Sequence, residues 1–110
     1  AKGIYFCKVN PEAATDIVVK KFPALNLTVE QALPAIKGLV HITNDKDTEQ
    51  YGYGYHNADE WKVMKEGGLL VQSITEDLPV EEYFTNDFIK AINDFDKAEV
   101  EADAAAYKIG

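Results

Sequence analysis

The stretch Gly3-Ile4-Tyr5-Phe6-Cys7-Lys8-Val9, followed by Asn10-Pro11, decides the fold that this sequence predicts. Its first seven residues are mostly aromatic or aliphatic, a composition typical of a short strand. Asn10 then suits a helix N-cap, and Pro11 suits the first helical position because it has no N–H to pair. The stretch therefore predicts a strand that leads directly into a helix, as in an α+β domain.

The segment after Pro11 is compatible with two structures. Ala14, Ile17 and Val18 lie at the spacing of one apolar helix face, and Pro23 would end such a helix. The run Ile17-Val18-Val19 also suits a second strand. Residues 15–22 are therefore either helix or strand on the sequence alone.

Two further helices are predicted from their start signals. Thr28-Val29-Glu30-Gln31 is a capping box, with Pro34 expected to bend the helix and Gly38 to end it. Asn57 is a second N-cap, and the pair Gly67-Gly68 is expected to end the helix that follows it.

The remaining segments complete an α+β prediction. Strands are expected at 39–42, 51–55 and 69–74, with a polar turn at 43–50. From Pro79 onward an apolar stripe at helical spacing predicts a long helix; its residues are Val80, Phe84, Phe88, Ile92 and Phe95. The stripe fades after Phe95, so residues 97–110 either continue this helix, form a second short helix or are partly frayed. The whole is a single domain over 1–110, with an α+β core at 3–75 (a small sheet of three to four strands covered by helices) and an acidic helical C-terminal extension at 76–110.

Charge is distributed very unevenly along the chain. The net charge is −8, all 11 basic residues are lysines, and arginine is absent. Residues 1–55 hold six lysines and six acidic residues, whereas residues 56–110 hold five lysines and 13 acidic residues. Because phosphate and anionic lipid surfaces are bound by basic clusters, we expect no direct nucleic-acid binding and no membrane partner. A partner protein with a basic surface is favoured.

The composition also indicates a compartment. Cys7 is the only cysteine, so no intrachain disulfide can form, and no apolar run approaches the length of a membrane span. The N-terminal stretch does not have the pattern of a signal peptide. These features predict a cytoplasmic protein.

Three stretches resemble the small domain shared by the ClpS adaptor and the C-terminal domain of ribosomal protein L7/L12. They are residues 4–10, residues 17–32 and residues 58–74. The resemblance implies a protein-binding domain. By the resemblance, Asn10 with Glu12 corresponds to the stretch with which ClpS binds the N-terminal residue of a degradation substrate, and His41 falls near its histidine. Asn10 matches this pattern, Glu12 matches it in part, and the remaining acidic residues of the pattern are missing.

No recognisable set of catalytic or metal-binding residues is present. Cys7 with His41 or His56 lacks the neighbours that activate a thiol and the spacing of a zinc site. The acidic run that begins at Asp45 resembles the start of a calcium loop, but Gln50 stands where that loop needs glycine. We therefore expect no enzymatic activity, no cofactor and no metal.

Two features favour an interaction surface. Tyr51, Tyr53 and Tyr55 alternate with Gly52 and Gly54, so an extended backbone would place all three rings on one face and leave the other open to another backbone. The alternative is a strand whose tyrosines cover a helix. The second feature is an acidic surface on the C-terminal helix, formed by Glu81, Glu82, Asp87, Asp94, Asp96, Glu99, Glu101 and Asp103. The alternative is the solvated face of an amphipathic helix, since charge runs on helices usually face water.

The sequence predicts a non-enzymatic adaptor or regulatory module that binds another protein through Asn10, Glu12, His41, Tyr51, Tyr53 and Tyr55. One alternative is an acidic inhibitor that mimics nucleic acid, of the kind that phages use against host defence. Another alternative is a structural subunit of a larger assembly, which would self-associate. The sequence leaves the oligomeric state and the identity of the partner open.

Overall fold

The computed structural model describes all 110 residues and contains helices but no strand, so the predicted α+β fold is wrong. Turns and loops join the helical elements, and no β ladder is present anywhere in the chain. In chain order the elements are α1 (Lys2–Val9), α2 (Pro11–Lys21), the 3₁₀ turn η1 (Pro23–Leu25), α3 (Val29–Thr43), α4 (Lys46–Tyr51), α5 (Ala58–Leu70), the 3₁₀ turn η2 (Val80–Glu82), α6 (Ile89–Ile92) and α7 (Lys97–Ala106).

The predicted helix starts are confirmed. Asn10 caps α2 by accepting a hydrogen bond from the Ala13 N–H at 3.0 Å. The Thr28 hydroxyl accepts from the Gln31 N–H at 3.2 Å, and the Gln31 side chain accepts from the Thr28 N–H at 2.9 Å, which completes the capping box. Asn57 caps α5. These signals succeed because a cap uses only residues within one turn of each other.

Every predicted strand is wrong. Residues 3–9 form α1, residues 39–42 form the end of α3, and residues 69–74 form the last residues of α5 and the turn after it. Aromatic and β-branched residues favour a strand only where neighbouring strands provide a surface for them. In α1 the Tyr5 ring instead contacts Phe95, with ring centroids 5.8 Å apart, and lies against the C-terminal part of the chain.

Two predicted helix ends and one predicted helix length are also wrong. α3 continues through Gly38 to Thr43, and the pair Gly67-Gly68 lies inside α5. The long acidic C-terminal helix is divided into η2, α6 and α7. In this region the Asn93 side chain donates to the Ile89 carbonyl and the Asp96 side chain accepts from the Ala98 N–H. Such local competition with backbone hydrogen bonding favours turns and caps over a continuous helix.

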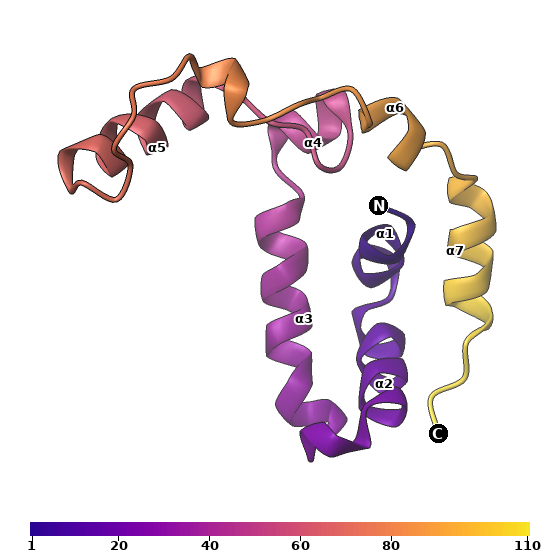
Figure 1. Cartoon of the computed structure of the whole chain (residues 1–110). Helices are drawn as coiled ribbons and strands as arrows, with labels where there is room; N and C mark the ends of the chain where they lie inside the picture. The colour runs from indigo at the N-terminus through magenta and orange to yellow at the C-terminus, as the bar shows by residue number, and fades with distance from the viewer.

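α1, α2, α3 and α7 form a helical bundle with α2 packed against both α1 and α3 (Figure 1). Within α2, Ala13, Ala14, Thr15 and Asp16 are all buried. α7 packs against α1, and the Asn10 side chain donates to the Ala104 carbonyl at 2.8 Å. Within the acidic C-terminal extension predicted at 76–110, α7 is therefore part of the bundle.

The middle of the chain leaves the bundle. Residues 57–88, which we call the arm, comprise α5, η2 and their connecting loops, and Figure 1 shows α5 projecting sideways from the end of α3. No residue between Tyr53 and Val100 is buried. The arm therefore has no interior of its own.

The molecule is much more open than a compact domain of its size. Its radius of gyration is 17.6 Å, against about 13 Å for a compact domain of this length. Its accessible surface is 7946 Å², which is about 1,900 Å² more than a folded monomer of 12.2 kDa exposes. The fold of a single chain thus leaves a large area uncovered.

Candidate assembly surface

Two asparagine side chains hold the segment that connects the bundle to the arm. The Asn93 amide accepts from the Tyr53 N–H at 2.9 Å and donates to the Tyr53 carbonyl at 3.0 Å. The Asn86 amide does the same for His56, at 2.8 and 2.9 Å. Each amide thereby satisfies both backbone groups of one residue, as a neighbouring strand would. The two amides fix residues 53–56, which contain a turn at Tyr53 and Gly54, without a sheet.

Gly52 and Gly54 allow this close approach. Their φ angles are +105° and +82°, a region that side-chain-bearing residues rarely adopt. A Cβ on Gly52 would lie 2.8 Å from the Asn93 side chain, and one on Gly54 would lie 2.9 Å from Ile92 Cδ1. The glycines were expected to admit another backbone. They admit the side chains of α6 and its C-cap instead.

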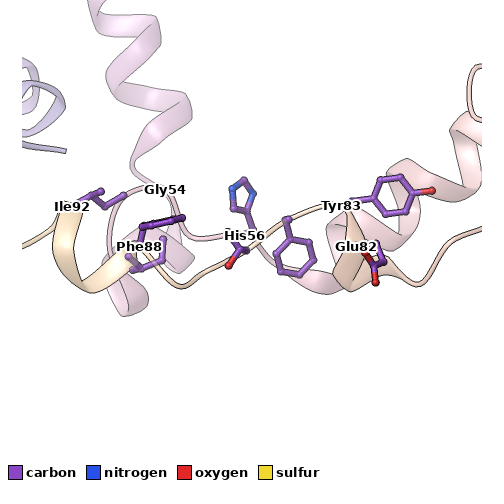
Figure 2. Close-up of a pocket in the computed structure, with 9 residues that line it drawn as sticks. Gly54, His56, Glu82, Tyr83, Phe88 and Ile92 are labelled. Carbon is purple, nitrogen blue, oxygen red and sulfur yellow. The ribbon is translucent and has the colours of Figure 1, made fainter.

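An open groove lies beside this junction (Figure 2). It has a volume of about 730 Å³. In Figure 2, Phe88 and Ile92 lie at one end, Glu82 and Tyr83 lie at the other, and His56 lies between them. Phe88 is 66% exposed and Ile92 is 44% exposed, so the apolar lining is in contact with water. The residues that line the groove are Gly54, His56, Glu82, Tyr83, Phe84, Thr85, Phe88, Ile89 and Ile92.

An aromatic cluster next to the groove holds the arm together. The Trp61 Nε1–H donates to His56 Nδ1 at 3.0 Å, and the Trp61 ring stacks on Phe84 and Tyr83 with centroids 5.9 and 6.4 Å apart. Lys65 adds an ion pair with Asp77 at 2.7 Å. These contacts fix α5 against η2, although each of the rings remains partly exposed.

The opposite end of the bundle carries a second uncovered apolar surface. Residues 20–28, which we call the knob, are all exposed and comprise the last two residues of α2 and the turn that leads to α3. The knob presents Phe22, Leu25 and Leu27, with exposed fractions of 60%, 52% and 42%. Figure 1 places this turn at the end of the bundle away from α4 and α6. Lys20 and Lys21 lie directly before Phe22 in the chain.

Most residues buried in the chain are small, whereas many of its large apolar residues are exposed. Val100 and Thr15 are the largest fully buried side chains, and the buried apolar set otherwise consists of Ala13, Ala14, Ala32, Ala104 and Tyr53. The exposed large apolar residues are Val9, Phe22, Leu25, Leu27, Leu39, Ile42, Tyr51, Val63, Met64, Leu70, Val71, Leu78, Phe88, Ile92 and Ile109. Soluble monomers bury such residues first, so this distribution indicates surfaces that another molecule covers.

The structure separates the residues predicted to bind a partner. Asn10 is engaged in the α2 cap and the contact with α7. Glu12 pairs with Lys37 of α3 at 3.2 Å, and its pKa is lowered by its own backbone N–H and then by Lys37. His41 is exposed on the last turn of α3. Asn10 and Glu12 therefore hold helices together in this structure, and the His41 side chain makes no hydrogen bond.

The three tyrosines do not share one face. The rings of Tyr51 and Tyr55 stack with centroids 4.2 Å apart, and both remain at least partly exposed. Tyr53 is 7% exposed, and its hydroxyl donates to Asn44 Oδ1 at 2.7 Å. Burial raises the pKa of this phenol. The predicted row is wrong because the positive φ angles of the two glycines turn the backbone between successive tyrosines.

The acidic residues of the C-terminal third lie on several elements. Asp96 caps α7, Glu99 pairs with Lys2 at 3.6 Å, and Glu101 accepts a hydrogen bond from the Tyr5 hydroxyl. The others, Glu81, Glu82, Asp87, Asp94 and Asp103, are exposed. Of these acidic residues, Glu81, Glu82 and Asp87 belong to the arm. The 32 residues of the arm include eight acidic residues and two lysines.

Other chemistry is not assembled in the structure. No three His, Cys, Asp or Glu side chains are grouped so that they could hold a metal ion. Cys7 is half-buried on α1, and burial raises the pKa of its thiol. A raised pKa lowers the fraction of reactive thiolate at neutral pH.

Comparison with known proteins gives no match to any family model, curated protein or solved structure. The resemblance to the ClpS and L7/L12 domain implies a sheet, which this structure lacks. None of the helices combines the length and apolar character that crossing a membrane requires.

Several residues of this surface were not singled out from the sequence. Asn86 and Asn93 act on residues 30 and 40 positions away, so no local pattern indicates them. The apolar knob did carry a signal, since Phe22, Leu25 and Leu27 lie close to Pro23, where a helix cannot continue. The apolar stripe in the sequence predicts that Phe88 and Ile92 lie on one helix face toward a core, whereas the structure exposes both side chains.

Proposed function

We propose that this protein is a structural subunit that assembles with further copies of itself. The observation that supports this most directly is the uncovered area. A chain of 12.2 kDa exposes about 1,900 Å² more than a folded monomer of that mass. Each partner of a standard interface buries about 800 Å², and obligate interfaces bury more. The excess therefore corresponds to the burial expected of a subunit in an obligate assembly.

The kind of area supports the same proposal. Obligate interfaces resemble a domain core cut in half, with large apolar residues on each side. Here the chain buries mostly alanines and exposes Phe22 and Phe88 by more than half. A monomer would leave these large apolar side chains in water and would gain no stabilisation from them, because hydrophobic stabilisation scales with the apolar area removed from water.

The experiment is a mass measurement in solution by sedimentation velocity and light scattering, at two salt concentrations. An assembly of several chains that persists in high salt is the expected result, because apolar burial is not screened by ions. A 12.2 kDa monomer at all accessible concentrations would contradict the proposal.

The same measurement distinguishes the functions expected from the sequence. An adaptor would remain a monomer until its partner is added. An acidic mimic of nucleic acid would remain a monomer and bind a basic protein in a manner that high salt abolishes.

A further inference from the structure

We infer that the assembly forms head to tail, with the knob of one copy seated in the groove of the next. This inference rests on the proposed self-assembly and specifies its interface. The knob is residues 20–28, and the groove is the open site lined by Phe88, Ile92 and their neighbours.

The two surfaces match in character and size. The knob presents three apolar side chains on a turn that projects from the bundle, namely Phe22, Leu25 and Leu27. The groove offers a concave site of about 730 Å³ lined mainly by aromatic and aliphatic side chains. This volume is within the range of sites that enclose a ligand of several apolar groups. A convex apolar turn is the complement that such a groove requires.

The charges around the two surfaces are complementary. Lys20 and Lys21 lie at the base of the knob, and Lys21 has no acidic partner within its own chain. Glu82 lines the groove, Asp87 is adjacent to Phe88, and both acidic residues are exposed and lack an ion pair. Seating the knob would bring Lys21 toward these carboxylates. Such complementarity steers encounter and fixes register.

Charge also opposes the symmetric alternative. The arm carries eight acidic residues and two lysines, which is a net charge of −6. A two-fold contact between two arms would place these like charges together, and like charges disfavour such a contact. Residues 1–55, which include the knob, have no net charge. Contact between the arm end of one copy and the bundle end of another avoids the repulsion.

The turn between α2 and α3, which carries the knob, and α6, which carries part of the groove lining, lie toward opposite ends of the molecule in Figure 1. The longest dimension of the molecule is 52 Å. One copy therefore cannot fill its own groove. An interface between two different surfaces leaves a free knob at one end and a free groove at the other, so it continues until a ring closes or a filament forms. The proposed interface thus predicts an assembly larger than a dimer.

The test uses one variant on each side of the interface. Leu25→Asp places a charge on the knob, and Phe88→Asp places one in the groove. Both positions are exposed in the single chain, so the helical circular dichroism spectrum should remain. Each variant alone should sediment as a 12.2 kDa monomer. Val71→Asp is the control, since Val71 is 71% exposed near the tip of the arm and should leave assembly unchanged.

Mixing the two variants gives the decisive result. The Leu25→Asp chain keeps a normal groove, and the Phe88→Asp chain keeps a normal knob. Together they should form a heterodimer of twice the chain mass that cannot grow further. A symmetric interface would give no such rescue, because each variant would carry its charge into the shared contact.

A second pair of variants works through charge and avoids any effect on apolar packing. Lys21→Glu and Glu82→Lys should each weaken assembly about tenfold or more at low salt, where charge pairs are least screened. The double variant should recover most of the loss.

The failures are distinguishable. If the unmodified protein is a monomer, the proposed function fails and the inference fails with it. If the unmodified protein assembles and Leu25→Asp and Phe88→Asp assemble equally well, only the head-to-tail interface is wrong. Loss of assembly in Val71→Asp alone would place the interface at the arm tip and would also overturn it.

Discussion

The side-chain amide of Asn93 pairs with both backbone groups of Tyr53, accepting from its N–H at 2.9 Å and donating to its carbonyl at 3.0 Å. The same amide donates to the Ile89 carbonyl at 2.8 Å. The Asn93 side chain therefore joins α6 to Tyr53, which is the only buried residue in the segment between α4 and α5. This contact fixes the position of the groove relative to the bundle.

Removing the Asn93 amide should destabilise the chain. Asn93→Ala leaves the Tyr53 backbone without its partners, at an expected cost of about 1–3 kcal/mol. Asn93→Asp keeps the acceptor but places a carboxylate against two carbonyls, so it should also destabilise. Urea denaturation followed by circular dichroism measures both. Asp94→Ala is the matched control, because Asp94 is exposed and makes no ion pair, and it should shift stability by less than about 0.5 kcal/mol.

Glycine-to-alanine substitutions should have opposite effects at two kinds of position. Gly54→Ala is strained by its φ of +82° and by Ile92, so it should destabilise by about 1 kcal/mol or more. Gly38 lies inside α3, and a Cβ at this position would meet no neighbouring atom within 4 Å, so Gly38→Ala should stabilise by about 0.4–1 kcal/mol. Thermal and urea unfolding would measure the two variants side by side. Equal effects would show that the turn at Gly54 is not held as described.

Tyr53→Ala should destabilise the fold, although the sequence predicted Tyr53 only as a partner-binding residue. The Tyr53 ring is 7% exposed and its hydroxyl bonds to Asn44, so truncation should cost about 3–5 kcal/mol. Tyr51→Ala, at a ring that is 46% exposed, should cost less than about 1.5 kcal/mol. The comparison of their unfolding midpoints separates the two roles, and similar midpoints would contradict the buried position of Tyr53.

Acid should weaken the bundle through Asp16. Its carboxylate accepts from Lys20 Nζ and the Tyr107 hydroxyl, each at 2.7 Å, and Lys20 and then Tyr107 lower its pKa below the usual 3.8. Because the folded-state pKa is depressed, this stabilisation is fully present above the unfolded-state pKa and is lost as the pH falls through the lower folded-state pKa. Asp16→Asn should be less stable than the unmodified protein at neutral pH and should lose less on acidification.

The pH profile has its own control in Tyr107→Phe. This variant removes one of the two donors to Asp16 and keeps the ring, so it should show part of the change seen in Asp16→Asn. Urea midpoints at neutral pH and below pH 3.8 give the comparison. Parallel profiles for all three proteins would show that Asp16 does not contribute to the acid sensitivity.

The sequence predicted the features that depend on interactions between nearby residues. It did not predict the features that depend on residues far apart in the chain. The caps at Asn10, Thr28 and Asn57 were predicted correctly because each involves a donor within three residues. The strand predicted at residues 3–9 failed because strand propensity is a property of the neighbours as much as of the chain. Here the neighbour of Tyr5 is α7, which is more than 90 residues away.

The candidate site depended on contacts that no local pattern contains. Asn86 and Asn93 look like ordinary turn residues in the sequence, and only their proximity to His56 and Tyr53 in the fold gives them their role. Phe88 and Ile92 fit an apolar helix stripe, which normally faces a core. The stripe prediction assumed that the core lay within one chain. If neighbouring copies provide that core, the sequence pattern was informative but the surface it packs against lies in another molecule.

Hydrogen exchange should show which part of the chain depends on assembly. The arm buries no residue, so in a monomeric variant such as Leu25→Asp its amides in α5 should exchange rapidly through local opening. In the assembled protein a seated knob would cover the groove between α6 and η2, and exchange in the arm should slow by about tenfold or more. Amides of α2, where four consecutive residues are buried, should be protected in both states and serve as the internal reference. Equal exchange of the arm in assembled and monomeric protein would mean that neighbouring copies do not contact it.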